Sequence, residues 1–278
     1  MGNGHCSDHV HEVARRLRSR CEAIFGAHFL GPEWQDGGHG LDRVQWYMAG
    51  RAAPLGAVTA PVAASVFGTI APGLVAAGLS RRGDSVWPIV TPEEVAHLKL
   101  VSAVAVLAEL IPTAGMDLER AVVLLGRALA AAETAGHPLY AGLSTFPEPP
   151  EPAAYLWRLC DMMREHRSDA HVTAWRSFGL DPVEINVLNE LWRDVRLGAI
   201  TGVNMGWDGD AAAAALGRLT ERGLAAGATI TPTGRDAREE IERITSAQQA
   251  SVVDALGSDA DELLGLLDPW ARTVAAAG

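Results

Sequence analysis

The stretch LTERGLAAGATITPTGR, residues 219–235, decides how the C-terminal half of this 278-residue chain folds. A helical pattern ends at Gly223, a residue type that favours the C-terminus of a helix. Two short apolar runs on either side of Gly227 predict a pair of antiparallel strands joined by a tight turn. Thr231 followed by Pro232 is typical of an N-cap and the first residue of the next helix. The stretch therefore predicts a helix, a small hairpin and a second helix.

Helical patterns dominate the rest of the chain. Proline fills four of the six positions in residues 147–152, which excludes a helix interior or a central strand there. We therefore divide the chain into an N-terminal helical domain, residues 1–146, and a C-terminal winged-helix-like domain, residues 153–278. The predicted fold class is mostly α with a short β-hairpin. Apolar residues at helical spacing predict helices at residues 8–29, 41–49, 60–79, 92–110, 117–135, 153–178, 183–192, 208–221, 235–256 and 259–275.

The order of elements in the C-terminal half is that of a winged helix. Residues 219–224 and 230–235 are similar to the end of the recognition helix and the exit of the wing in MarR-type regulators, and this resemblance implies ligand-responsive DNA binding. The recognition helix would begin with Asp208 and Asp210, which repel phosphates, and continue with five alanines, which offer base edges no donors. The sequence therefore favours a winged helix that packs or binds a ligand over one that reads DNA.

Most of the chain, residues 22–234, also resembles a group of actinobacterial helix-turn-helix proteins. This chain departs from the group at Ser168 and Ala170, where glycine is usual, and at Thr69, where asparagine is expected. The resemblance implies the two-part architecture and a role for the charged helix at residues 164–172, but no particular reaction. We expect a protein of actinobacterial, specialised metabolism. The matching segments are residues 50–56 (GRAAPLG), 71–75, 137–139 and 164–172, where the group commonly reads REHRGDGHV.

Composition excludes several classes of protein. The formal net charge of −11 is unfavourable for a protein that must neutralise phosphates, so DNA is not an expected partner. The apolar content of 48% excludes global disorder. Cys6, Cys21 and Cys160 include no close pair, so neither a disulfide framework nor a four-thiolate metal site is predicted. We see no signal peptide and no uninterrupted membrane span, and we expect a cytoplasmic protein.

Residues 164–171, REHRSDAH, place six ionisable side chains within one predicted helix. Arg167 falls in the middle of the apolar stripe of that helix, and His166 and His171 lie on its two shoulders. A guanidinium that faces a protein core keeps its charge and must be paired, either with a protein carboxylate or with a ligand. The apolar stripe consists of Leu156, Leu159, Met163, Ala170 and Ala174.

Two interpretations of this segment remain open. In the first, Arg167 pairs with an Asp or Glu from the first domain and the histidines complete a structural network. In the second, Arg167 binds an anionic group of a ligand while His166 or His171 exchanges protons with it, and Asp169 orients His166. Glu165 and Asp169 are expected to point mostly to the other side of the helix. The two histidines are five residues apart, the wrong spacing for two metal ligands on one helix face, so no metal site is assigned.

Four further residues are candidates for binding a ligand. Arg51 either caps a helix C-terminus or lines the pocket. Trp46 is either part of the core or a wall for a flat ligand. Met163 and His28 complete the set. Motifs for hydrolases and for nucleotide cofactors are missing from the sequence, and the cofactor is left unknown.

We therefore expect a small-molecule-handling protein that binds an organic ligand between its two domains. Acid–base chemistry on that ligand is an extension that leaves open whether the protein is an enzyme. The alternative is a MarR-like, ligand-responsive transcriptional regulator, and a third interpretation is a structural module that binds a partner protein. A small molecule is the expected partner, DNA and membranes are not, and the helices at residues 235–256 and 259–275 are candidates for a homodimer interface.

Overall fold

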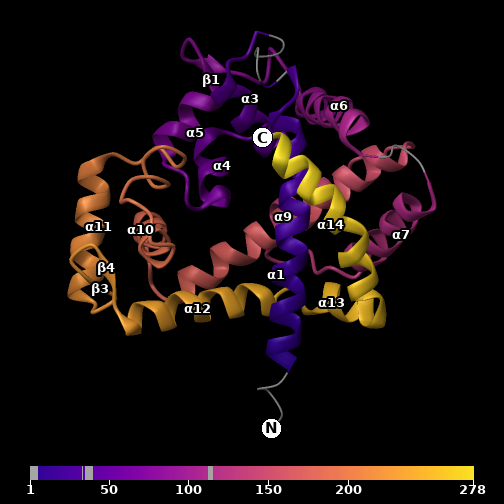
Figure 1. Cartoon of the computed structure of the whole chain (residues 1–278). Coiled ribbons are helices and arrows are strands. Elements are labelled where there is room, and N and C mark those ends of the chain that lie inside the picture. Colours follow the sequence, from indigo (N-terminus) through magenta and orange to yellow (C-terminus); the bar gives the residue numbers. More distant parts are fainter. Residues whose placement is uncertain (1–5, 33, 35–39, 112–114) are drawn as a thin grey trace.

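The computed structural model describes residues 6–32, 34, 40–111 and 115–278, and the fold of this part of the chain is mostly α, as the sequence predicts (Figure 1). None of its helices is both long and apolar enough to cross a membrane. The helices are α1 (Cys6–Phe25), η1 (Gly26–Phe29), α3 (Arg43–Ala52), η2 (Ala53–Leu55), α4 (Ala60–Phe67), α5 (Pro72–Gly78), α6 (Pro92–Leu110), α7 (Met116–Ala130), α8 (Pro138–Leu143), α9 (Pro152–Ser177), α10 (Pro182–Trp192), α11 (Gly209–Glu221), α12 (Pro232–Ala247), α13 (Ala250–Leu256), η3 (Gly257–Asp259) and α14 (Ala260–Ala277).

Two antiparallel hairpins complete the fold. Strand β1 (Ser80–Arg81) pairs with β2 (Asp84–Ser85), and β3 (Ala225–Ala226) pairs with β4 (Thr229–Ile230). The second hairpin is the one that the sequence predicts between α11 and α12, and it has Gly227 in the left-handed region at its turn, with φ of 57°.

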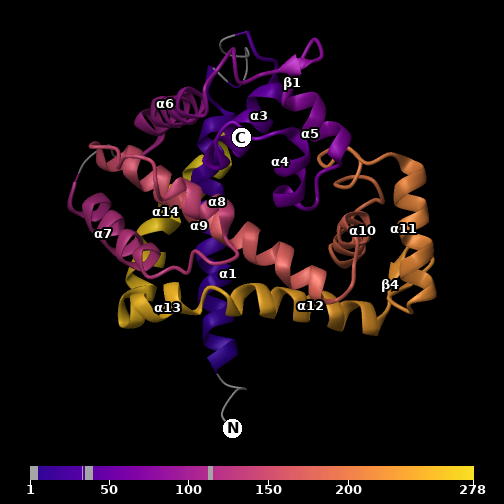
Figure 2. The ribbon, with the colours of Figure 1, turned by 180° about the vertical axis from the view of Figure 1, so that it is seen from behind.

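The largest core lies where α9 crosses α1, and both views show α9 running past α1 (Figures 1 and 2). Helices α1, α6, α7, α9, α13 and α14 contribute to this core. The indole of Trp157 on α9 is fully buried there and donates a hydrogen bond to the carbonyl of Phe25, at 3.1 Å. Apolar packing therefore continues across residues 147–152, where the sequence analysis divides the chain, and that division remains a prediction. The segments that the sequence offers for dimerisation form α12, α13 and α14; buried residues of α13 and α14 belong to this core, and a homodimer interface remains a prediction.

A separate apolar cluster supports the winged-helix region formed by α10, α11, β3, β4 and α12, which lies on one side of the molecule in both views. The connection between α10 and α11, residues 193–208, is much longer than the turn of about three or four residues in simple helix-turn-helix motifs. The carboxylate of Glu190 fixes the first part of this connection. It accepts hydrogen bonds from the backbone N–H groups of Gly198, Ile200 and Thr201, at 2.8, 2.6 and 2.6 Å. The connection is therefore an ordered element rather than a loose loop.

The same connection docks on the turn between α4 and α5. The carbonyl of Thr69 accepts hydrogen bonds from Asn186 Nδ2 and Trp207 Nε1, both at 2.9 Å, and the N–H of Ala71 donates to the carbonyl of Met205 at 2.8 Å. These bonds fix the winged-helix region against the N-terminal half and so determine the space between them.

Several boundaries differ from those predicted. The expected helix at residues 60–79 is two helices, because the chain turns at Gly68, which has φ of 70°. The expected helix at residues 235–256 breaks after Ala247, and helix α3 continues through Gly50 to Ala52. Helix α8 and the hairpin β1–β2 were not predicted, because each is too short to show a periodic pattern.

Candidate functional site

Three cavities follow one another along α1, and we call them together the groove. The central cavity has a volume of about 580 Å³ and lies among α1, α9, α10, α12 and the residue 193–208 connection. The outer cavity, about 630 Å³, lies between α1 and α12. The aromatic cavity, about 590 Å³, lies between α1 and α3. Glu22 lines all three, so they are contiguous.

The central cavity carries an excess of positive charge. Among the described residues that line it, four are arginines and two are carboxylates, so two positive charges remain uncompensated in a chain whose formal net charge is −11. A cavity with this charge favours an anionic ligand. The charged lining residues are Arg18, Arg167, Arg193, Arg238, Glu22 and Glu242.

Glu242 on α12 holds two of these arginines in place. Its two carboxylate oxygens accept from Arg167 and from Arg238, each at 2.5 Å, and Arg238 also donates to the side chain of Asn189 at 3.1 Å. Burial opposes the ionisation of Glu242, but the two guanidinium groups outweigh it and hold its pKa below the ordinary value. One carboxylate thus forms ion pairs with two arginines. The partner of Arg167 comes from the C-terminal half of the chain and not from the first domain, where a structural network was expected to supply it.

The imidazole of His171 lines the same cavity beside Arg167. Its Nδ1 lies 3.0 Å from the hydroxyl of Thr245, and that hydroxyl donates its single proton to the carbonyl of Ile241. The hydroxyl oxygen must therefore accept from Nδ1–H, which assigns the lone pair to Nε2. Burial, together with the charge of Arg167, lowers the pKa of His171 to about 3. At neutral pH this ring is an uncharged hydrogen-bond acceptor and a weak base.

Arg193 is the exposed cation of the central cavity. It follows the last residue of α10, and it makes no ion pair with any residue that the structure describes. Arg18, on the opposite wall, pairs with Glu22 at 3.2 Å, with both side chains partly exposed. An incoming anion therefore meets an uncompensated guanidinium at the position of Arg193.

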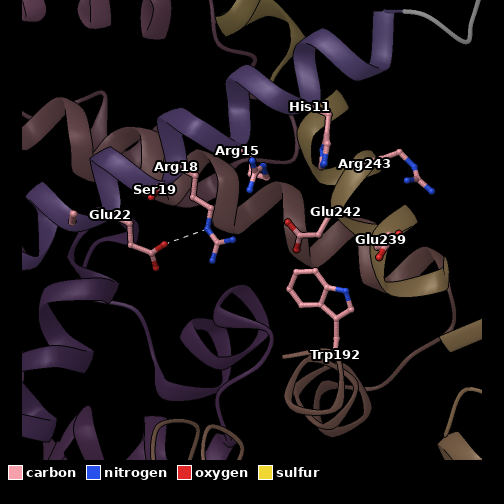
Figure 3. Close-up of a pocket in the computed structure, with 10 residues that line it drawn as sticks. His11, Arg15, Arg18, Ser19, Glu22, Trp192, Glu239, Glu242 and Arg243 are labelled. Carbon is pink, nitrogen blue, oxygen red and sulfur yellow. Dashed lines mark hydrogen bonds and ion pairs between the residues drawn. The ribbon is translucent and has the colours of Figure 1, made fainter. Parts of the chain in front are cut away.

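The outer cavity extends the central one towards the N-terminus of α1 (Figure 3). Figure 3 shows Arg15 and Arg18 pointing from α1 into the space, Glu242 reaching in from α12 and the indole of Trp192 lying across from α1. Arg18, Glu22, Trp192 and Glu242 line both cavities. Three arginines and three carboxylates line the outer cavity, so it lacks the positive excess of the central one.

The aromatic cavity extends the groove in the other direction. The rings of Phe25, Phe29, Trp34 and Tyr47 line it. Phe29 meets Trp34 edge to face, with ring centroids 4.9 Å apart, and Trp34 lies 6.2 Å from Tyr47 at 75°. Met205 lines this cavity as well as the central one. A cationic cavity and an aromatic cavity thus lie next to each other.

His166 and Asp169 lie outside the groove. The ring of His166 stacks on His137, with centroids 4.0 Å apart, and burial together with His137 lowers its pKa to about 4. Asp169 accepts hydrogen bonds from the backbone N–H groups of Leu139 and Tyr140, at 3.0 and 3.1 Å, and burial raises its pKa to about 7. Asp169 therefore anchors α8 rather than orienting His166. His166 and Asp169 both contact Tyr140 at the start of α8, the former through its ring with centroids 5.0 Å apart, and only His171 lines the groove.

The predicted ligand-binding residues other than Arg167 lie in the interior. Arg51, Trp46 and His28 surround an enclosed space of about 10 Å³, which has room for one water molecule at most. Arg51 donates to Ser168 at 2.8 Å and pairs with Glu165 at 3.5 Å. Met163 is fully buried in the largest core.

The acidic residues of α9 are buried, contrary to the expectation that Glu165 and Asp169 would point away from the core. Glu165 pairs with Arg51 and Arg164, and Asp161 pairs with Lys99 at 2.9 Å. The expectation was wrong because helices pack on more than one side of α9, so a single apolar stripe does not mark its whole buried surface.

Helix α11 has few groups to offer DNA. Arg218 pairs with Asp181 at 2.6 Å and with Glu184 at 3.2 Å, and Arg222 donates to the carbonyls of Phe178 and Gly179. Its exposed positions carry alanine, glycine, threonine and acidic residues. Within the described ranges, no group of three or more His, Cys, Asp or Glu side chains could hold a metal ion.

Sequence reasoning missed Glu242 and Thr245, the partners that α12 supplies to Arg167 and His171. Arg238 and Glu242 are four residues apart on α12, a spacing at which opposite charges meet on a helix, and this was the available signal. Arg18 and Glu22 have the same spacing on α1, whereas nothing comparable marks Arg193.

Comparison with known proteins gives one match. A search of curated proteins found no match, and neither did a search of solved structures. A family model described as a helix-turn-helix family matches residues 14–278, nearly the whole chain, and covers all the residues named as lining the groove except His11. The chain belongs to this helix-turn-helix family.

Proposed function

We propose that the protein binds a small organic anion in the central cavity of the groove. The observation that carries this proposal is the excess of arginine over carboxylate in a cavity of about 580 Å³ within an acidic chain. A cavity of this size suits a metabolite, and an uncompensated guanidinium favours a carboxylate or phosphate. The resemblance to actinobacterial proteins in residues 164–172, which include Arg167 and His171, supports a ligand from specialised metabolism.

The test uses Arg193, because this exposed side chain can be changed without disturbing the core. Native mass spectrometry of untagged protein should detect a bound organic anion in the wild type and lose it in Arg193→Gln. Arg196→Gln is the matched control, because Arg196 is exposed on the same connection but does not line the central cavity. A wild-type protein without a bound anion, or equal retention in Arg193→Gln, would contradict the proposal.

Binding without chemical conversion is the form of the function that the geometry favours. His171 is the one predicted catalytic residue in the groove, and with a pKa of about 3 it is a poor proton acceptor near neutrality. Incubating the protein with its ligand and analysing the ligand by mass spectrometry tests this point. Recovery of unchanged ligand supports a binding protein, and a new product indicates an enzyme.

Family membership favours a second candidate, a MarR-like transcriptional regulator whose DNA affinity depends on the ligand. It would act as a homodimer with a basic stripe formed across two copies. Electrophoretic mobility shift of its own promoter region at low salt tests this candidate. Binding that weakens steeply with salt supports it, and the absence of a shift at low salt rules it out.

A further inference from the structure

We infer that the ligand is an aromatic carboxylate, with its carboxylate in the central cavity and its ring system in the aromatic cavity. This inference rests on the proposed function and specifies the ligand for the same groove. It starts from the adjacency of two unlike cavities, one rich in arginine and the other lined by four aromatic rings.

The aromatic cavity has the shape and chemistry to hold a flat apolar group. Trp34 stands roughly perpendicular to both Phe29 and Tyr47, at 73° and 75°, so the rings form walls rather than one filled stack. Apolar side chains continue to its rim, where Val44 is 40% and Val203 is 76% exposed. A ligand that covers these exposed apolar side chains removes them from water, and this makes the free energy of binding more favourable.

Two cations line the aromatic cavity, Arg43 and Arg164, and neither of them is without a partner. Arg164 forms a close ion pair with Glu165, and its guanidinium lies over the ring of Phe25, 4.4 Å from the centroid. A second anionic group on the ligand would compete with Glu165, which is 2% exposed. The aromatic end of the ligand is therefore uncharged, and its single anionic group belongs at the other end of the groove.

Helix α9 sets the distance between the two ends. Arg164, Arg167 and His171 follow each other at spacings of three and four residues, so they lie on one face of the helix. Arg164 lines the aromatic cavity, and the other two line the central cavity. At a rise of about 1.5 Å per residue, the two ends are separated by roughly 5 to 10 Å along the helix axis. A one-ring acid such as benzoate is too short for this separation, whereas in a two-ring aromatic acid the centre of the ring farther from the carboxylate reaches its lower end.

Isothermal titration calorimetry with three probes tests the inference: naphthalene-2-carboxylate, which has both groups, acetate, which has only the anion, and naphthalene-2-methanol, which has only the rings. Naphthalene-2-carboxylate should bind about tenfold or more tightly than either of the others, because it alone uses both cavities. Equal affinity of acetate and naphthalene-2-carboxylate would overturn the inference.

Variants separate the contributions of the two cavities. Trp34→Ala removes one aromatic wall, and Val203→Glu places a charge at the exposed rim without changing the core. Each should weaken binding of naphthalene-2-carboxylate about tenfold and leave acetate binding within about twofold, while the control Val195→Glu changes neither. Val195 is exposed on the same connection but lines none of the three cavities.

The failures of the two proposals are distinguishable. In one outcome, acetate and naphthalene-2-carboxylate both bind and both need Arg193, but neither Trp34→Ala nor Val203→Glu weakens binding of naphthalene-2-carboxylate. The assignment of the aromatic cavity is then wrong, and the anion site remains. If neither acid binds, or if Arg193→Gln binds both as the wild type does, the anion site itself is wrong and both proposals are overturned.

Discussion

Replacing Asp169 with asparagine should stabilise the protein at pH 8 and have little effect at pH 5. The carboxyl of Asp169 is 3% exposed, and burial raises its pKa from 3.8 to about 7. Its Oδ2 accepts hydrogen bonds from the N–H groups of Leu139 and Tyr140, while Oδ1 has no hydrogen-bond partner among the described residues. The native state therefore resists ionisation at this site.

The sign and size of the effect follow from this raised pKa. Between pH 4 and pH 7 the unfolded chain releases the Asp169 proton while the folded protein retains it, so stability falls as pH rises through this range. A difference of about 3 pKa units corresponds to about 4 kcal/mol, of which roughly 2 to 3 kcal/mol develops between pH 5 and pH 8. Asparagine keeps the acceptor for both N–H groups and cannot ionise, so Asp169→Asn removes this loss. Its unpartnered amide reduces the gain by about 1 kcal/mol at either pH.

Urea denaturation at pH 5 and pH 8 measures the effect as a difference in the free energy of unfolding. Asp254→Asn is the matched control, because Asp254 is exposed on α13. The stability advantage of Asp169→Asn should be larger at pH 8 than at pH 5 by roughly 2 kcal/mol, with no such change in the control. A constant destabilisation at both pH values would refute the reasoning and show that the N-terminus of α8 stabilises an ionised carboxylate.

Three further changes test other parts of the structure by denaturation. Gly142→Ala should destabilise the protein by about 3 kcal/mol or more, because an added Cβ would lie 1.9 Å from the carbonyl oxygen of Pro54. Gly217→Ala, where an added Cβ meets no atom within 4 Å, should stabilise α11 by up to about 1 kcal/mol. Equal effects of the two substitutions would contradict this packing. Glu242→Gln should cost about 3 to 5 kcal/mol, because it leaves two buried guanidinium groups without a counter-charge; a neutral effect would show that solvent reaches them. Lowering the pH from 7 to 4.5 should reduce the free energy of unfolding of the wild type by about 2 to 3 kcal/mol more than that of His166→Phe. The reason is that the native state resists protonation of His166, whose pKa is about 4. Parallel pH profiles of the two proteins would contradict this.

In the winged-helix region, membership of a helix-turn-helix family does not by itself indicate DNA binding. Family membership and the order of its elements are those of a helix-turn-helix protein, yet the arginines of α11 are occupied within the chain. The long connection between α10 and α11 is also bonded to the α4–α5 turn. Residues of this connection line the central cavity, so a ligand bound there would contact the segment that joins α10 to α11.

The local elements were predictable from the sequence because their signals lie within a few residues. Helix α6 spans Pro92–Leu110 as predicted, because Thr91 and Glu94 form a capping box and Pro92 suits the first turn. The hairpin β3–β4 follows from Gly227 at its turn. The mostly α fold class rests on the same short-range patterns.

The arrangement of the site was decided by contacts between distant parts of the chain. The sequence identified Arg167 as a cation that needs a partner, but Glu242 is 75 residues away and one of many acidic residues that could have met it. The sequence grouped His166 and Asp169 with Arg167 because they are close along one helix, but packing placed His166 and Asp169 against the start of α8 and Arg167 against α12. Periodicity indicates which apolar residues are buried, because it depends on local geometry, but it did not indicate that Glu165 and Asp169 are buried as well. Which buried charge meets which depends on how the helices pack, and only the tertiary structure determines that.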